Sequence, residues 1–215
     1  MKQTRISAPA TVAYLLILVA TTVVLTSSSA QRDNHLLLAV STNIHQLAHV
    51  PVRVLVASAF WTGGWWDLAR WTVLFAVIVA PVEHRLGWRP TTVTFAAGHI
   101  GATLVVAAGI WSGVRLGEVN PADTLARDVG ASYGFFAIAA FAAYLLAPRL
   151  RLPYLFVIIG YLAAKAALFH TFTDFGHVAA VAIGLACYPL ACTHDGRARV
   201  SLSPRPRGLE PADAT

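Results

Sequence analysis

Two polar side chains stand near the start of two apolar segments, and their chemistry is complementary. Ser132 belongs to Asp-Val-Gly-Ala-Ser-Tyr-Gly at positions 128–134, at the mouth of an apolar segment that runs to about residue 147. His177 lies forty-five residues further on, near the start of another apolar segment. A buried hydroxyl costs free energy unless something bonds to it, so we expect Ser132 to face His177. A hydrogen bond between them requires the serine and histidine atoms to lie about 2.6 to 3.2 Å apart.

Small residues accompany both side chains and should let their helices approach closely, as small residues do in lipid. We expect Ser132 and His177 to lie at matching depth, about seven residues or ~10 Å inside the outer ends of their helices at 1.5 Å per residue. The small residues expected to face one another across this contact are Gly130, Ala131 and Gly134 on the serine segment and Gly176, Ala180 and Gly184 on the histidine segment.

The composition is that of a protein embedded in a lipid bilayer. Of 215 residues, 57% are hydrophobic and 12% are charged, which is more apolar surface than a soluble domain can bury. A membrane span requires roughly 20 mostly apolar residues, and helices satisfy their own backbone polar groups in lipid. We therefore predict an all-α polytopic membrane protein without strands. Its six transmembrane helices are expected at approximately 8–26, 68–82, 91–111, 129–147, 152–168 and 172–192, and the second could begin a turn earlier.

The basic residues indicate how the chain is oriented. With the N-terminus in the cytoplasm, ten of the sixteen Lys and Arg residues fall on cytoplasmic segments, five on outer segments, and only Lys165 inside a span. This positive-inside bias predicts that both termini are cytoplasmic and that Ser132 and His177 lie near the outer face. The net charge of +6 is then explained mostly by basic residues that set the orientation of the chain in the membrane. The sequence has no basic domain that would bind nucleic acid. Arginine outnumbers lysine in an alanine-rich chain, which indicates a GC-rich bacterial genome. The predicted location is the bacterial plasma membrane.

We expect four segments along the chain. Residues 1–30 form a short cytoplasmic N-terminus and the first transmembrane helix, although this stretch would also pass as a secretory signal peptide. Residues 31–66 form an outer loop that lies in the membrane interface as short amphipathic helices. Residues 67–192 form a five-helix core, and residues 193–215, rich in Pro, Arg, Ser and Gly, form a disordered cytoplasmic tail.

Four further polar residues fall in or beside the predicted spans. Lys165 is expected to snorkel toward the outer interface from the end of its span. Asp128 and Asp174 are expected to cap helix N-termini, where a carboxylate is favoured. His99 stands between glycines well inside a span. An ionisable residue at that depth is a functional candidate by default, with a structural hydrogen bond to a neighbouring helix as the alternative.

The six-span pattern, with serine in the fourth segment and histidine in the sixth, resembles the rhomboid family of intramembrane serine proteases. The resemblance covers approximately residues 36–190 and includes the long first loop, the Val-Glu-His-Arg-Leu-Gly turn at 82–87, Gly-Ala-Ser132, and Gly-His177 with Gly184 seven residues later. It implies a rhomboid-like six-helix bundle in which Ser132 is the nucleophile and His177 the general base, without an aspartate or a cofactor. The substrate implied is a transmembrane segment of another protein.

The chain departs from the family at positions that support the reaction. Rhomboids carry H-x-x-x-N in the second span, which supplies oxyanion-hole donors; counting back from Glu83, these positions hold Asp67 and Trp71. A carboxylate there would repel the developing oxyanion, and one lost donor can cost ~10²–10³ in rate. Tyr133 replaces the glycine that follows the serine in the family, so it would crowd the site or contribute a hydroxyl. His99 is the residue that could compensate.

Two readings of the resemblance stay open. The first is a serine endopeptidase that cleaves membrane segments with Ser132 and His177. The second is a catalytically inactive, rhomboid-like scaffold, a pseudoprotease that binds membrane helices without cutting them. Asp67, Trp71 and Tyr133 favour the scaffold, whereas the presence of both Ser132 and His177 favours the enzyme.

A third reading belongs to another class of chemistry. His170, Asp174 and His177 are spaced at i, i+4 and i+7 and would share a helix face, and His99 would add a fourth ligand for zinc in a membrane hydrolase. The sequence around Asp174 is more typical of a loop and a helix cap than of a continuous helix. We therefore predict no metal site.

Overall fold

The computed structural model describes residues 7–27, 30–125, 127–169 and 171–192, and these ranges contain helices and turns but no strand. This confirms the predicted all-α class. The α-helices are α1 (Pro9–Thr26), α2 (Ala30–Val40), α3 (Ile44–His49), α4 (Pro51–Ala57), α5 (Trp65–Leu74), α6 (Ala80–Leu86), α7 (Trp88–Leu116), α8 (Ser132–Phe141), α9 (Pro148–Phe169) and α10 (Phe172–Ala186). Short 3-10 helices cover Ser58–Phe60, Pro121–Leu125 and Ala142–Leu145, and a π-helix covers Phe75–Val79.

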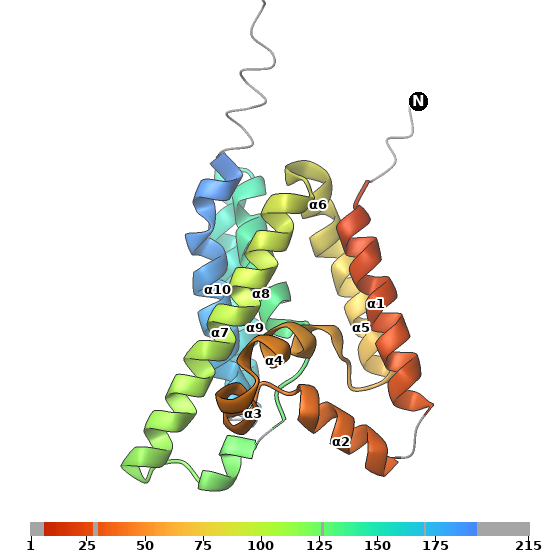
Figure 1. Ribbon diagram of the computed structural model, residues 1–215. Helices are drawn as coiled ribbons and strands as arrows, with labels where there is room; N and C mark the ends of the chain where they lie inside the picture. The colour runs from red at the N-terminus through yellow and green to blue at the C-terminus, as the bar shows by residue number, and fades with distance from the viewer. Residues whose placement is uncertain (1–6, 28–29, 126, 170, 193–215) are drawn as a thin grey trace, which may run out of the picture.

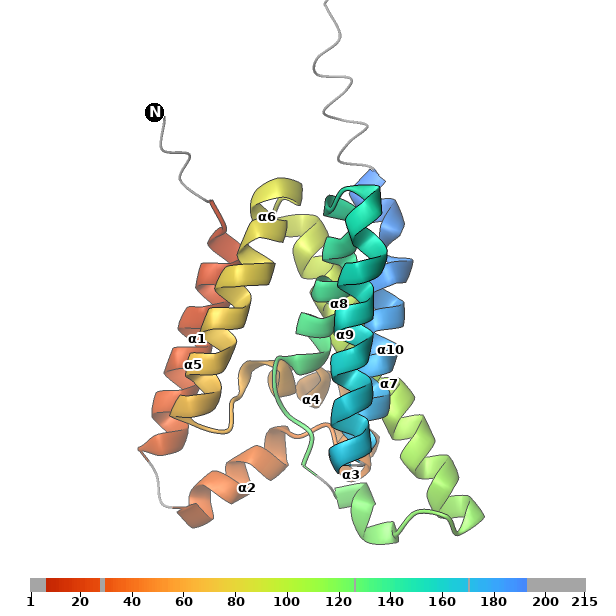
Figure 2. The ribbon, with the colours of Figure 1, turned by 180° about the vertical axis from the view of Figure 1, so that it is seen from behind.

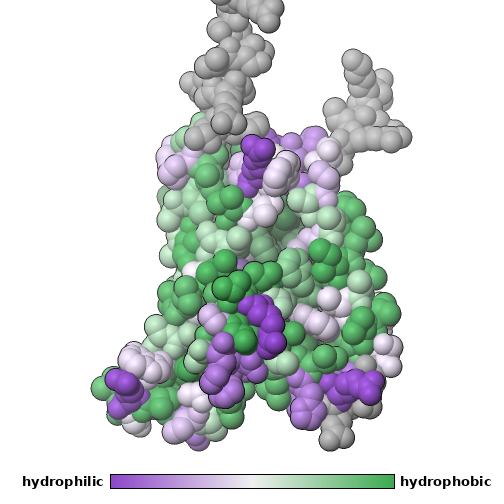
Figure 3. Space-filling view, viewed as in Figure 1, coloured by the Kyte–Doolittle hydropathy of each residue, from purple (hydrophilic) through white to green (hydrophobic). Residues whose placement is uncertain are grey.

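Five helical stretches within the described residues are long and apolar enough to cross a membrane: α1, Trp65–Leu86, α7, α9 and Phe172–Cys192. They stand side by side, and α1 begins at the same end of the bundle at which α10 finishes (Figures 1 and 2). Hydrophobic residues cover the flanks of the bundle, and hydrophilic residues gather at one end and over the layer of short helices at the other (Figure 3). This is the surface of a multi-pass membrane protein.

The second predicted span is a continuous helical stretch that begins at Trp65, a turn earlier than the apolar window at 68–82. It changes geometry halfway, because Pro81 has no N–H to donate to the carbonyl four residues earlier. The helix widens into the π-turn Phe75–Val79 just before this proline and then continues as α6. π-Turns of this kind are frequent at functional sites.

The fourth predicted span, 129–147, is shorter than its apolar window and begins later, at Ser132. Gly130 has a φ of 122°, a conformation that residues with a side chain rarely adopt, and its N–H donates to the Ser58 carbonyl over 2.8 Å. The chain therefore enters the bundle as a loop, which the hydrogen bond from Gly130 to Ser58 fixes in place, and the helix begins only after it. A short helix is sufficient because α8 lies among the other helices, where protein covers its ends; Ala137, Ile138 and Phe141 have no exposed surface.

Glycines let α7 and α10 close on α8 from two sides. A Cβ atom at Gly98 of α7 would lie 2.1 Å from the Ala137 Cβ, and one at Gly184 of α10 would lie 2.0 Å from the Ala137 carbonyl oxygen. We expected Gly134 to face α10, but it faces α7. A Cβ atom at Gly134 would lie 2.3 Å from the Phe95 ring. Close approach of α8 and α10 therefore depends on Gly184 together with Gly176.

The first helix is bonded into the bundle by a buried carboxylate. Glu83, 2% exposed on α6, accepts the backbone N–H groups of Ala10 and Thr11 over 2.8 and 2.7 Å and the Thr11 hydroxyl over 2.6 Å. A carboxylate at the positive end of a helix is favourable, and here it satisfies N–H groups that have no partner inside α1. Helices α2 to α4 lie across the opposite end of the bundle (Figure 1).

Candidate active site

A cavity of about 820 Å³ opens among α5, α8, α9 and α10, and both Ser132 and His177 line it. Its deeper wall is apolar and includes Leu74 and Ile78 from the second span and Val157 and Ile158 from α9. In Figure 2, α5 stands on one side and α9 on the other, and α8 lies behind α9. The structure thus brings the two predicted chemical residues to one site between helices.

Ser132 is the first residue of α8 and is half-buried. Its depth differs from the prediction, because it stands at a helix start and not seven residues inside one. The N–H groups in the first turn of a helix have no acceptor within that helix. In α8 the first backbone hydrogen bond of the helix joins the Phe135 N–H to the Ala131 carbonyl over 2.9 Å. The serine hydroxyl is therefore next to backbone donors at the positive end of a helix dipole.

His177 is 5% exposed on α10, and neither ring nitrogen has a hydrogen-bond partner among the described residues. The hydrogen bond that we expected from Ser132 is therefore not formed in this structure. The imidazole packs edge-on against the rings of Tyr133 and Phe136, with centroids 5.4 and 4.8 Å apart. A buried polar group without a partner is costly, so His177 is held by its aromatic neighbours in a state that a partner would stabilise.

Tyr133 lies behind His177 and does not line the cavity. It is 2% exposed, and its hydroxyl donates to Asp128 Oδ2 over 3.3 Å. The ring fits because position 176 is glycine: a Cβ there would lie 2.4 Å from the Tyr133 ring. Tyr133, which stands where the family has a glycine, is thus accommodated by Gly176 on the facing helix. Its hydroxyl is already bonded to Asp128.

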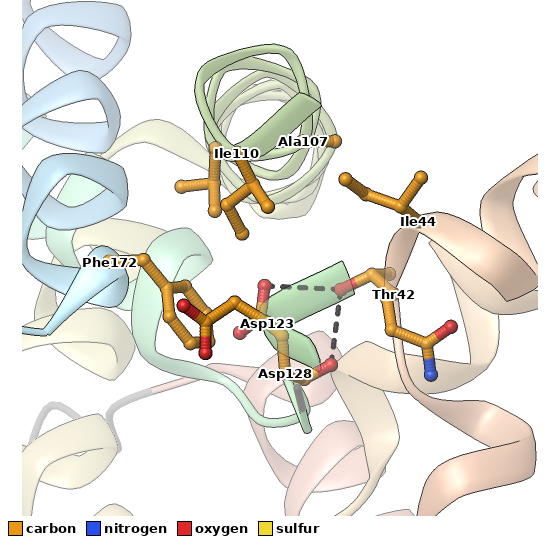
Figure 4. Close-up of a pocket in the computed structure, with 9 residues that line it drawn as sticks. Thr42, Ile44, Ala107, Ile110, Asp123, Asp128 and Phe172 are labelled. Atoms are coloured by element: carbon orange, nitrogen blue, oxygen red, sulfur yellow. Dashed lines mark hydrogen bonds between the residues drawn. The ribbon is translucent and has the colours of Figure 1, made fainter. Parts of the chain in front are cut away.

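Asp128 has a different role from the helix cap that we predicted, because α8 has no side-chain cap. Its backbone carbonyl and Oδ2 accept the Thr42 hydroxyl over 3.0 and 3.2 Å, as the dashed lines in Figure 4 show. These bonds fasten the loop before Ser132 to the segment between α2 and α3. A small cavity of about 10 Å³ adjoins both residues, which is room for roughly one water. Burial raises the pKa of Asp128 to about 6, against the opposing effect of the hydrogen bonds from Thr42 and Tyr133.

Asp67 and Trp71 both line the cavity, on the wall opposite α9. The Asp67 carboxylate is paired with Arg70 and also accepts the Gly63 N–H over 3.0 Å. Trp71 is 5% exposed and packs edge-on against Phe135, with centroids 5.5 Å apart. The negative charge that we expected to oppose an oxyanion is thus partly neutralised by its own neighbour on the helix.

His99 does not line the cavity. Its Nε2 shares a hydrogen bond of 3.0 Å with the Ser58 hydroxyl, and the Ser58 carbonyl accepts the N–H of Gly130. The connection runs from His99 through Ser58 to the loop that ends at Ser132. Sequence reasoning missed Ser58, because a serine in a short helix forty-one positions from its partner carries no local signal.

Lys165 forms an ion pair, which the prediction of a snorkelling side chain did not include. Its ammonium group bonds Asp174 Oδ1 over 2.6 Å, at a site where the lysine side chain is 26% exposed. This ion pair joins α9 to the first turn of α10. The predicted cap at Asp174 is confirmed: its carboxylate accepts the Thr171 backbone N–H over 2.9 Å and the Thr171 hydroxyl over 2.8 Å, the reciprocal bonds of a capping box.

The zinc reading finds no support in the part of the chain that the structure describes. No three His, Cys, Asp or Glu side chains gather there as a metal site requires. His170 lies outside the described residues. Asp174 is already bonded to Lys165 and Thr171, and His99 to Ser58.

The comparison with known families agrees with the geometry. No curated protein and no solved structure shows significant similarity to the chain. A family model described as rhomboid-like protein matches residues 4–197, a range that contains every described helix from α1 to α10 and both Ser132 and His177. Since this match covers most of the 215 residues, the chain belongs to the rhomboid-like family, as the residues around Glu83, Ser132 and His177 predicted.

Proposed function

We propose that this protein is an intramembrane serine endopeptidase that cleaves transmembrane segments of other membrane proteins with Ser132 and His177. The observation that carries the proposal is that both side chains line one cavity of about 820 Å³, and that the buried histidine has no hydrogen-bond partner in the described part of the chain. Structural histidines normally have their ring nitrogens bonded. An imidazole without a partner in the wall of the same cavity as a serine is suited to accept a proton from it.

The substrate would reach the serine from the side, through the lipid. The cavity wall changes from polar residues near Ser132 to apolar residues of α5, α8 and α9 deeper in the bundle. Helix α9 is mostly exposed along its length, and Leu152 and Phe156 are 78% and 77% exposed. An apolar segment can therefore pass between α5 and α9 without leaving a hydrophobic environment.

In the proposed reaction the Ser132 Oγ attacks the carbonyl carbon of the scissile peptide, and His177 takes the hydroxyl proton. The oxyanion that forms would accept hydrogen bonds from the N–H groups at the start of α8, and the helix dipole there stabilises negative charge. The C–N bond then breaks, and His177 returns the proton to the leaving amine. Water hydrolyses the acyl-enzyme by the same route. Ser132 and His177 must first form the hydrogen bond that this structure lacks, and in many enzymes such a bond closes only when substrate binds.

A second function is favoured by a specific observation. The Asp67 carboxylate lies in the cavity wall where related proteases are expected to present a hydrogen-bond donor, and the serine and histidine are not bonded to each other. Both facts suit a catalytically inactive scaffold that holds a membrane helix in the same cavity. The location proposed for either function is the bacterial plasma membrane, with the cavity near the outer face and both termini in the cytoplasm.

Labelling with a fluorophosphonate probe tests the choice between enzyme and scaffold. Detergent-purified protein should be labelled covalently at Ser132, and both Ser132→Ala and His177→Ala should abolish the label while their thermal unfolding stays cooperative. Folded protein that takes no label, beside an active rhomboid control that does, would refute the enzyme. Capture of membrane helices by such unlabelled protein would then support the scaffold.

A further inference from the structure

We propose that Arg127 selects the substrate, by binding a carboxylate side chain that lies just outside the apolar part of the transmembrane segment. This inference rests on the proposed function, because it assumes that a membrane segment occupies the cavity beside Ser132. It adds the chemical class of that segment.

The cavity has a polarity gradient along its length. Three cations line its polar end, namely Arg70, Arg127 and Lys165, whereas Ile78 and Val157 line its deep end. On α9 the step from Lys165 to Val157 is eight residues, or ~12 Å at 1.5 Å per residue. An extended peptide covers that distance with about four residues. A segment seated in the cavity thus has its apolar part at the deep end and a residue roughly four positions away at the cations.

Two of the three cations already have partners. Arg70 is paired with Asp67 on the same helix, and Lys165 with Asp174 across the α9–α10 contact. Arg127 has neither a carboxylate nor a hydrogen-bond partner within the described ranges, and its side chain is exposed. The remaining carboxylate, Asp128, is held by Thr42 and Tyr133.

The position of Arg127 suits recognition close to the cut. It precedes Asp128 on the loop that Thr42 and Ser58 hold by hydrogen bonds, and that loop leads directly into Ser132. A carboxylate on the substrate can therefore form an ion pair with Arg127 while the neighbouring peptide bond lies at the serine. Guanidinium groups bind carboxylates through two parallel hydrogen bonds, which adds geometric selection to charge.

Peptide binding to full-length Ser132→Ala protein in detergent tests this proposal without cleavage. The probes are fluorescent peptides with one apolar transmembrane stretch, followed four residues later by Glu, Gln or Lys, and the measurement is fluorescence anisotropy. The Glu peptide should bind about two- to fivefold more tightly than the Gln peptide, the size of an exposed, bidentate ion pair. In the Arg127→Gln background this ratio should fall to about one, and Arg127→Glu should favour the Lys peptide.

Arg115→Gln is the matched control, because Arg115 stacks on Trp111 at 4.0 Å at the far end of α7 and does not line the cavity. It should leave the ratio unchanged. Equal binding of the Glu and Gln peptides, or a preference that survives Arg127→Gln, would overturn this inference alone. Failure of every peptide to bind folded Ser132→Ala protein would overturn the proposed function with it.

Discussion

Replacing Asp128 by Asn should stabilise the folded protein at neutral pH, although it removes a charged group that makes two hydrogen bonds. Burial raises the pKa of Asp128 from an ordinary value of 3.8 to about 6. The folded protein therefore holds a proton between about pH 4 and pH 6 that the unfolded chain has lost. Its stability falls as the pH rises through this window and is level above it. The asparagine amide oxygen can accept the Thr42 and Tyr133 hydroxyls without carrying this charge.

The difference between a pKa of 3.8 and one of about 6 corresponds to at most about 3 kcal/mol of unfolding free energy, at 1.36 kcal/mol per pKa unit. Asp128 retains some solvent exposure, so screening reduces this limit, and we expect about 1–2 kcal/mol. In a protein of this size that raises the melting temperature by about 3–6 °C at pH 7.5 and by nothing at pH 4.

Thermal unfolding in detergent, followed by circular dichroism between pH 4 and pH 8, measures this difference. The wild-type midpoint should fall across pH 4 to 6, and the Asp128→Asn midpoint should lose that slope. Glu118→Gln removes an exposed carboxylate on the same side of the bundle and serves as the control. A variant that melts lower than wild type at pH 7.5, or that keeps the wild-type slope, would refute the reasoning.

Three further changes test the packing and positioning. Glu83→Ala should destabilise the protein by about 3 kcal/mol in denaturant unfolding, because it leaves two buried N–H groups and a hydroxyl of α1 without an acceptor; a loss under 1 kcal/mol would contradict that role. Gly184→Ala should cost about 1–3 kcal/mol, since its Cβ strikes the α8 backbone at 2.0 Å, whereas Gly160→Ala on α9 meets nothing within 4 Å and should be neutral; equal melting temperatures would count against the close contact. His99→Leu should slow labelling of Ser132 by about tenfold with little change in peptide affinity, because it releases the loop before α8; unchanged labelling kinetics would show that His99 does not position the serine.

The apolar runs of the chain were sufficient to predict the class, the membrane environment and most of the helices. A membrane span depends on the summed hydrophobicity of about twenty consecutive residues, and that sum is a local property of the sequence. The same holds for the capping box at Thr171 and Asp174, whose partners are three residues apart. That Ser132 and His177 line one cavity was also predictable, because only a few polar residues stand at the mouths of apolar segments.

The tertiary structure decided how the polar residues are paired. The bonds of Glu83 to α1, of His99 to Ser58 and of Asp128 to Thr42 join residues that are 41 to 86 positions apart. Which of them meet depends on how the helices pack, and no local pattern encodes that. Lys165 pairs with Asp174 because the packing of α9 against α10 placed this carboxylate within reach. The late start of α8 has the same origin, since hydropathy cannot show that the Gly130 N–H is held by a carbonyl of another segment.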